Sequence, residues 1–259
     1  MVHLASPREF YAFSLRWSRR IGSVTALLLF VGLYLGLFVA PPDYQQGDSY
    51  RIMFVHVPSA WMSLFVYSIL AGAGAVALIW RVKVAEVVAA ASAPIGAAFT
   101  ALALATGSIW GKPMWGTFWV WDARLTSELV LLFLYLGYMA LDAAIEDRRT
   151  ASRAAAILAL VGVVDLPIIH YSVEWWNTLH QGPTVTKLGA PSIHPSMLAP
   201  LLIMALAFTG YYLALMLVRA RCELLVRERG SAWVQEIAAA DGAPHPDPRF
   251  SHQRKTLES

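Results

Sequence analysis

Residues 108–128 read SIWGKPMWGTFWVWDARLTSE, a short aromatic and charged segment with long apolar runs on both sides. Its chemistry-bearing residues are Trp110, Lys112, Trp115, Trp119, Trp121, Asp122, Arg124 and Glu128. Indole rings and charged groups favour the boundary between lipid and water, whereas the flanking runs favour the hydrocarbon interior. The segment therefore predicts a connection between two membrane-spanning helices at one membrane face.

The composition extends this pattern to the whole chain. Hydrophobic residues make up 58% of the 259 residues and charged residues only 14%, well below the roughly 25% charged content of ordinary soluble domains. Apolar runs of about 20 residues are long enough to cross a bilayer; here they fall at 21–40, 58–80, 85–107, 126–145, 154–172 and 195–218. We expect an all-α integral membrane protein, a bundle of six transmembrane helices.

An even number of spans places both termini on one side of the membrane. Sixteen of the twenty lysines and arginines fall on that side, and the other four are Arg51, Lys112, Arg124 and Lys187. The positive-inside rule therefore predicts cytoplasmic termini and places the tryptophan-rich segment in the second outer loop. We expect a cytoplasmic N-terminal segment (1–20), a membrane domain (21–218) with a ligand-binding segment at about 108–128, and a partly disordered cytoplasmic tail (219–259).

Several classes of protein are excluded at this point. Cys222 is the only cysteine, so the chain has no internal disulfide, no paired-thiol redox motif and no C-x-x-C-H haem attachment sequence. The formal net charge of +3 is small, so we do not expect a nucleic-acid partner. In the run 85–107, the small residues of AAASAPIGAA predict a helix that packs closely inside the bundle.

The second outer loop has the composition of a site for a flat ligand. Gly111, Lys112, Pro113 and Gly116 are expected to break the helix and let backbone approach a ligand, and Trp119 and Trp121 would share one face of an extended segment. Each aromatic contact adds about 0.5–1.5 kcal/mol beyond the buried area. Several such rings would hold a tetrapyrrole.

A haem would also need axial ligands, for which neutral imidazole is the usual donor. His56, at the mouth of the second span, and His180, in the third outer loop, could approach the tryptophans from opposite sides. A lone loop histidine is more often exposed or hydrogen-bonded, so both interpretations remain open on the residues alone. For His170 and His194 a structural hydrogen bond is expected.

The haem propionates would need cations, and Arg51 and Arg124 are the best candidates because arginine binds carboxylate in bidentate fashion. Arg124 could instead be neutralised by Asp122 or Glu128. Asp165, expected near the middle of the fifth span, must be protonated, paired or facing water. We favour a neutral acid hydrogen-bonded to a neighbouring helix over a proton relay.

The segment 110–128 resembles the tryptophan-rich WWD signature of haem-handling proteins of cytochrome c maturation, and the membrane part of the chain is similar to the haem exporter protein C (CcmC) family. The resemblance also rests on DYQQGDSYRI and HVP around His56, on APIGA, and on LPIIHYSVEWWNTLHQG around His180. It implies non-covalently bound haem b, with His56 and His180 as axial iron ligands. The implied haem-binding set is completed by Trp110, Trp115, Trp119, Trp121, Asp122, Arg51 and Arg124. Asp165 departs from the asparagine expected in many relatives.

The resemblance further implies a location in the bacterial inner membrane with a periplasmic functional face. The implied partners are the ABC-type subunits CcmA and CcmB, the small membrane subunit CcmD, the haem chaperone CcmE and membrane lipid. The expected role is to present haem to CcmE for cytochrome c biogenesis, as a transfer subunit rather than an enzyme.

Two alternatives from other classes are kept. A haem lyase would itself join haem to apocytochrome c, although related lyases usually have more spans and extra domains. A b-type electron-transfer subunit would place histidine pairs on helices at membrane depth, whereas His56 and His180 are expected in loops at one face.

Overall fold

The computed structural model describes residues 5–180, 182, 185 and 190–240, and within these residues it contains helices and no strand. The main helices are α1 (Pro7–Tyr34), α2 (Met53–Trp80), α3 (Lys83–Trp115), α4 (Ala123–Ala144), α5 (Arg148–Gly162), α6 (Asp165–Trp175), α7 (Pro195–Arg227) and α8 (Ala232–Ala240). The short segments η2 (Leu35–Val39) and η3 (Asp48–Ile52) precede α2. The all-α prediction is confirmed.

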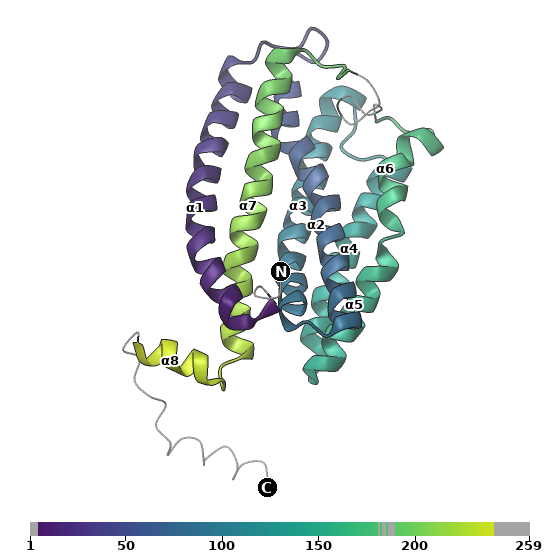
Figure 1. Cartoon of the computed structure of the whole chain (residues 1–259). Coiled ribbons are helices and arrows are strands. Elements are labelled where there is room, and N and C mark those ends of the chain that lie inside the picture. The colour runs from purple at the N-terminus through teal and green to yellow at the C-terminus, as the bar shows by residue number, and fades with distance from the viewer. Residues whose placement is uncertain (1–4, 181, 183–184, 186–189, 241–259) are drawn as a thin grey trace.

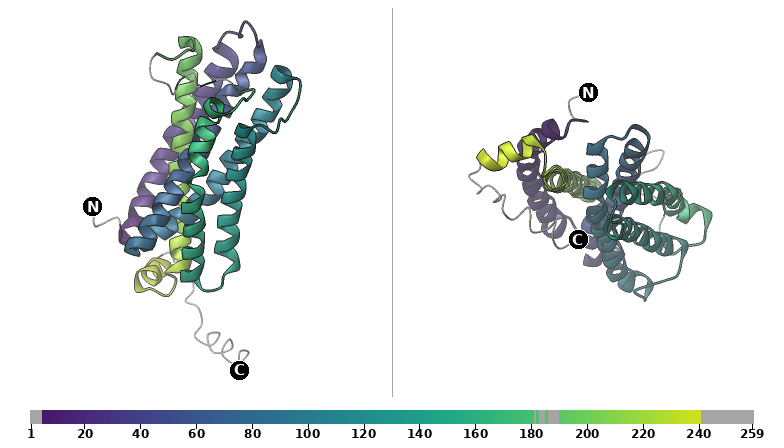
Figure 2. Two further views of the ribbon diagram at one scale, coloured as in Figure 1. Left: turned by 90° about the vertical axis from the view of Figure 1, so that its right-hand side faces the viewer. Right: turned by 90° about the horizontal axis from the view of Figure 1, so that it is seen from below.

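Six helical stretches among these residues are long and apolar enough to cross a membrane, as predicted, with α5 and α6 together forming the fifth. Figures 1 and 2 show these helices running side by side as one bundle, with α8 lying beyond the end of α7. The start of α1 and the end of α7 lie at the same, lower end of Figure 1. The helix α1 begins at Pro7, inside the expected N-terminal segment, and residues 241–259 of the expected tail lie outside the described residues.

The fifth span is interrupted near its middle, where Asp165 lies as expected. The helix α5 ends at Gly162 and α6 begins at Asp165, after two residues whose backbone N–H groups donate to carbonyls three positions back. Pro167 lacks an N–H group and its ring crowds the carbonyl of Val163, so the α-helical ladder stops there. Asp165 therefore lies near the middle of the span and is the first residue of α6.

The expected hydrogen bond of Asp165 to a neighbouring helix is not found among the described residues. Within the described part of the chain, its Oδ2 has no hydrogen-bond partner, although the residue is only 9% exposed. The helix break leaves the carboxyl group buried at the start of α6.

The interior of the bundle is built around α3, the most buried of the six spans. Its small residues let neighbouring helices approach closely: the position of Gly96 is covered by the ring of Tyr135 from α4. The Tyr135 hydroxyl donates to the Ser63 carbonyl of α2 at 2.8 Å, so one side chain joins three helices. The prediction of a close-packing helix in the run 85–107 is confirmed.

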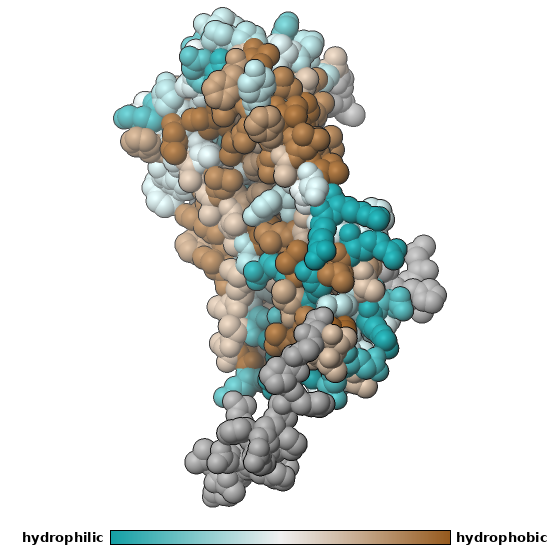
Figure 3. Space-filling view, turned by 90° about the vertical axis from the view of Figure 1, so that its left-hand side faces the viewer, coloured by the Kyte–Doolittle hydropathy of each residue, from teal (hydrophilic) through white to brown (hydrophobic). Residues whose placement is uncertain are grey.

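The outward faces carry the apolar side chains that a membrane requires. The most hydrophobic window of α1 is only 17% buried, and Leu27 and Phe30 are 63% and 71% exposed. Figure 3 shows apolar side chains over much of this face, with hydrophilic side chains gathered toward the two ends of the bundle. Exposed leucine and phenylalanine on a spanning helix are satisfied by lipid.

We predict that Tyr135→Ala lowers the free energy of unfolding by about 3–5 kcal/mol, the usual cost of deleting a buried aromatic ring. The reason is that Tyr135 is 0% exposed and fills the space above Gly96. Phe133→Ala on the same helix is the control, because that ring is 61% exposed. Denaturation of the purified protein measures both, and equal losses would contradict this packing role.

Candidate functional site

A cavity of about 690 Å³ opens at the end of the bundle where α2 begins and α3 ends, the upper end in Figure 1. Small-molecule sites commonly measure about 300–1,000 Å³. The cavity lies among α2, α3, α4, α6 and the segment that follows α6. Its lining includes His56, Trp61, Trp110, Trp115, Arg124, His170, Glu174 and His180.

His56 lies in the first turn of α2, not in a loop as expected, because that helix already begins at Met53. Its Nδ1 lies 3.0 Å from the carbonyl oxygen of Ala103 and 3.1 Å from the hydroxyl of Thr106, both on α3. A carbonyl oxygen only accepts, so Nδ1 carries the proton and Nε2 keeps its lone pair. The imidazole is therefore held in the tautomer that can bind a metal through Nε2.

Gly107 explains how the His56 ring comes so close to α3. A Cβ atom at this position would lie 2.9 Å from Cε1 of His56, closer than van der Waals contact allows. Only the absent side chain of glycine leaves room for the ring. Gly107 is therefore part of the site, although no pattern in the sequence distinguishes it from the packing glycines of the same helix.

His180, in the segment after α6, is oriented by a carboxylate. Its Nδ1 lies 3.3 Å from Oδ2 of Asp122, and the two side chains are 19% and 6% exposed. Oδ1 of Asp122 accepts from the backbone N–H of Leu125 and caps the start of α4. One aspartate thus fixes both a helix end and an imidazole, and Nε2 of that imidazole has no hydrogen-bond partner among the described residues.

Burial sets the protonation state of His180. Desolvation lowers its pKa below the ordinary value, and the nearby Arg124 cation acts in the same direction. The Asp122 carboxylate opposes them by favouring the charged imidazolium. Since desolvation is the largest effect, His180 is neutral at physiological pH, which is the form that coordinates metals.

Two of the four predicted tryptophans line the cavity beside the histidines. The ring of Trp110 meets His56 edge-on with centroids 5.7 Å apart, and Trp115 meets His180 with centroids 4.7 Å apart. Trp110 Nε1 donates to the Gln46 side chain at 3.0 Å. Each imidazole is therefore paired with one indole.

The expected helix break before Trp115 is wrong. The helix α3 continues through Gly111, Lys112 and Pro113 and ends only at Gly116, whose φ of 78° is left-handed. Pro113 is tolerated because its ring costs one hydrogen bond near the helix end, and Gly116 adopts the left-handed cap without strain. Trp110 and Trp115 are consequently carried on a helix.

Trp119 and Trp121 lie in the irregular stretch between α3 and α4 and are not among the lining residues. Their rings contact each other with centroids 5.4 Å apart, and Trp121 is 76% exposed. Trp119 Nε1 is buried without a hydrogen-bond partner in the part of the chain that the structure describes. These two indoles form a separate patch at the same end of the bundle.

The two predicted arginines differ in their surroundings. Arg124 lines the cavity and donates through Nη1 to the Ile169 carbonyl at 3.0 Å, which joins α4 to α6. Arg51 is bound to the Asp48 carboxylate at 2.8 Å and to the Gly36 carbonyl at 2.9 Å, outside the lining. Of the two, Arg124 is placed to meet a ligand in the cavity.

Sequence reasoning missed Trp61, His170 and Glu174 as cavity residues. His170 and Glu174 are four residues apart on α6, a spacing that puts them on one helix face and was the available signal. Instead of the expected hydrogen bond, His170 makes an edge-on contact with Tyr171. His194 does make the expected bonds, accepting from the Ser196 backbone N–H and contacting its hydroxyl at the start of α7.

The residues present fit a haem. Two imidazoles with free Nε2 atoms, two indoles and one arginine face a single cavity, and these groups supply axial donors, aromatic surface and a cation for carboxylates. Within the described residues, no cluster of three or more histidine, cysteine, aspartate or glutamate side chains is found. Fold and cavity together define a multi-pass helical membrane protein with a candidate ligand cavity at one end.

Comparison with known proteins specifies this class further. The family model of heme exporter protein C matches residues 1–235. "Heme exporter protein C" of Haemophilus influenzae is 53% identical over 234 residues, 90% of this chain and 95% of that protein. "Heme exporter protein C" of Escherichia coli K12 is 51% identical over 239 residues, 92% and 96% of the two chains. A "putative cytochrome c biosynthesis ccmC-like mitochondrial protein" of Marchantia polymorpha is 42% identical over 217 residues, 83% and 92% of the two chains. The chain belongs to the heme exporter protein C family.

We predict that Asp122→Asn lowers the pKa of His180 further, because it removes the carboxylate that favours the imidazolium. Asparagine still caps α4, so the helix start should be preserved. Nuclear magnetic resonance titration of isotope-labelled histidine measures the shift. Asp147→Asn, at the exposed cap of α5, is the control and should leave His180 unchanged. A raised pKa of His180 in the Asp122 variant would contradict this electrostatic role.

Proposed function

We propose that this protein binds haem b non-covalently in the cavity between α2, α3 and α6 and presents it for cytochrome c biogenesis. The observation that carries the proposal is the pair His56 and His180, each with Nδ1 committed to an acceptor and Nε2 available, in one cavity. Family membership supports haem as the ligand, since the relatives are named heme exporters.

Each residue of the proposed site has a separate task. His56 and His180 would be the axial iron ligands, and Trp110 and Trp115 would contact the ring through faces or edges next to those imidazoles. Arg124 would pair with a propionate in bidentate fashion, whereas Arg51 would first have to leave Asp48. Trp119 and Trp121 would extend the aromatic surface toward an incoming partner.

Asp122 would control the strength with which His180 binds iron. A carboxylate that accepts from Nδ1 raises the basicity of the imidazole and fixes its orientation. His56 is fixed on α2, whereas His180 lies between α6 and α7, so the position of His180 would depend on its hydrogen bond with Asp122. His56 would thus be the ligand that retains haem, and His180 would be the ligand whose bond to iron is lost when haem is released.

The proposed setting is the bacterial inner membrane, with this cavity on the periplasmic face and the arginine-rich end in the cytoplasm. The proposed partners are the haem chaperone CcmE, which receives haem, the ABC-type subunits CcmA and CcmB, and the small membrane subunit CcmD. Names of relatives that refer to heme export and cytochrome c biosynthesis support this setting. We propose a transfer role, with bond formation occurring on the chaperone.

We predict that His56→Ala and His180→Ala each convert a six-coordinate haem spectrum of the purified protein to a five-coordinate one. Loss of an axial ligand should weaken haem binding by at least the roughly 10-fold to 100-fold seen when even a supporting group is removed. Optical and paramagnetic resonance spectra measure both effects.

His194→Ala is the control outside the cavity, because His194 only caps α7. His170→Ala tests the third imidazole in the lining and should preserve six-coordination. If His170→Ala abolished six-coordination while His56→Ala or His180→Ala did not, the assigned pair would be wrong. A protein that binds no added haem would refute the proposed function.

We also predict that the wild-type protein, with its ABC-type partners, transfers haem to purified CcmE, and that His180→Ala reduces the yield. Incubation of the protein with haem and apocytochrome c, without other subunits, should give no thioether product. Formation of thioether-linked cytochrome in that reaction would instead establish a haem lyase. Absorbance of the denatured products separates the outcomes, because only covalently attached haem stays with the protein.

A further inference from the structure

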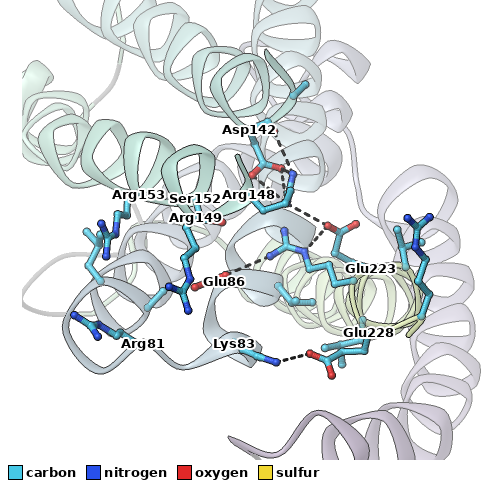
Figure 4. A pocket seen from close by; sticks show the side chains of 18 residues that line it. Arg81, Lys83, Glu86, Asp142, Arg148, Arg149, Ser152, Arg153, Glu223 and Glu228 are labelled. Atoms are coloured by element: carbon cyan, nitrogen blue, oxygen red, sulfur yellow. Dashed lines mark hydrogen bonds and ion pairs between the residues drawn. The ribbon is translucent and has the colours of Figure 1, made fainter. Parts of the chain in front are cut away.

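The opposite end of the bundle contains a second cavity, of about 890 Å³, among the ends of α2, α3, α4, α5 and α7. Figure 4 shows that arginine, lysine, aspartate and glutamate side chains converge on it. It is remote from the histidine cavity, since α2 ends here and begins there. None of the histidines or tryptophans of the proposed haem site lines it.

One side of this cavity is a closed network of ion pairs. Arg148 contacts the Asp142 carboxylate at 3.3 Å, and Arg227 contacts Glu223 at 2.7 Å and Glu86 at 3.5 Å. A further pair, Lys83 with Glu228 at 2.7 Å, extends the network. These charges hold helix ends together and are largely neutralised within the protein.

The other side carries cations without such partners. In the part of the chain that the structure describes, Arg81, Arg149 and Arg153 make no side-chain hydrogen bond or ion pair, and all three are exposed. Figure 4 shows them together on the left of the cavity, away from Glu223 and Glu228. The carboxylate of the neighbouring Asp147 is engaged by the backbone and hydroxyl of Thr150. The Asp147 charge also acts on Arg149, but no carboxylate among the described residues forms an ion pair with any of the three guanidinium groups on this wall.

Arg81 also has an unusual backbone conformation. Its φ of 56° is left-handed, and among the described residues it is the one non-glycine residue with positive φ. It occupies the position after α2 where glycine is the usual residue. This strained backbone conformation occurs where the arginine side chain reaches the cavity, which is consistent with a role for that side chain.

The cavity is amphipathic. Ala77 and Leu78 of α2 and Val87 of α3 line it together with the charged groups. Trp80, next to this wall, is 66% exposed, as is usual for an indole at the lipid–water interface. The lining thus combines a cationic rim with apolar surface.

We propose that this second cavity binds an anionic phospholipid of the leaflet at the arginine-rich end, its phosphate bound by Arg81, Arg149 and Arg153 and its acyl part lying along α2. Guanidinium groups match phosphate oxygens in bidentate geometry. Basic pockets between transmembrane helices at this face recognise acidic headgroups. The positive-inside rule explains why cations occur in these cytoplasmic turns. It does not explain why three of them line one cavity that also has an apolar wall. An acidic protein segment would not need that apolar wall.

The test uses full-length protein in nanodiscs of phosphatidylcholine with increasing phosphatidylglycerol or cardiolipin, with bound lipid counted by native mass spectrometry. Wild-type protein should retain anionic lipid selectively. Arg149→Gln with Arg153→Gln should reduce the selectivity for anionic lipid about 30-fold. The reason is that each cation near the membrane surface strengthens binding of anionic lipid about fivefold. Arg149→Lys with Arg153→Lys should restore part of it.

The matched control is Arg16→Gln with Arg19→Gln, which removes two exposed arginines of α1 at the same end but outside the cavity. This control should keep wild-type selectivity, and an unchanged haem spectrum should show that each variant is folded. The proposal would be overturned if the wild-type protein retained phosphatidylcholine as well as it retains anionic lipid. It would also be overturned if the two double glutamine variants lost the same amount of selectivity. Inorganic phosphate that displaces the lipid at millimolar concentration would assign the cavity to a soluble phosphate instead, and binding of an acidic peptide without lipid would assign it to a protein partner.

Discussion

The close approach of α2 and α3 is the constraint on which the rest of this structure depends. At the ligand end, the His56 ring packs over Gly107 and reaches the Ala103 carbonyl, which is possible only because no side chain separates the two helices. Deeper in the bundle, Gly96 and Tyr135 bring α4 against the same pair. The missing side chain at Gly107 of α3 thus lets His56 take the position that the proposed function requires.

The two ends of the bundle use polar side chains differently. At the histidine end, hydrogen bonds orient the side chains that face the cavity: Asp122 orients His180, and a backbone carbonyl of α6 holds Arg124. At the opposite end, ion pairs neutralise one cavity wall and leave arginines on the other. This difference is the reason why we propose two different ligands, an iron porphyrin at the histidine end and an acidic lipid at the other.

Much of the candidate site could be predicted from the sequence because its residue types are rare in a membrane protein. Histidines and clustered tryptophans beside apolar runs indicate a ligand site without knowledge of helix ends. The local structure was harder to predict: Pro113 lies inside α3, whereas Pro167 coincides with the break between α5 and α6. Whether a proline ends a helix depends on its distance from the helix end and on its neighbours, which a local pattern does not contain.

The sequence by itself determined the class of protein, the number of spans and the residue types of the ligand end, since hydrophobic length and charge distribution act locally along the chain. Only the tertiary structure decided which candidates face one cavity: His56, His180, Trp110, Trp115 and Arg124 do, whereas Trp119, Trp121 and Arg51 are outside its lining. It also brought His170 and Trp61 into that lining. The reason is that convergence depends on the rotation and depth of several helices at once, and these are set by packing between segments far apart in the chain.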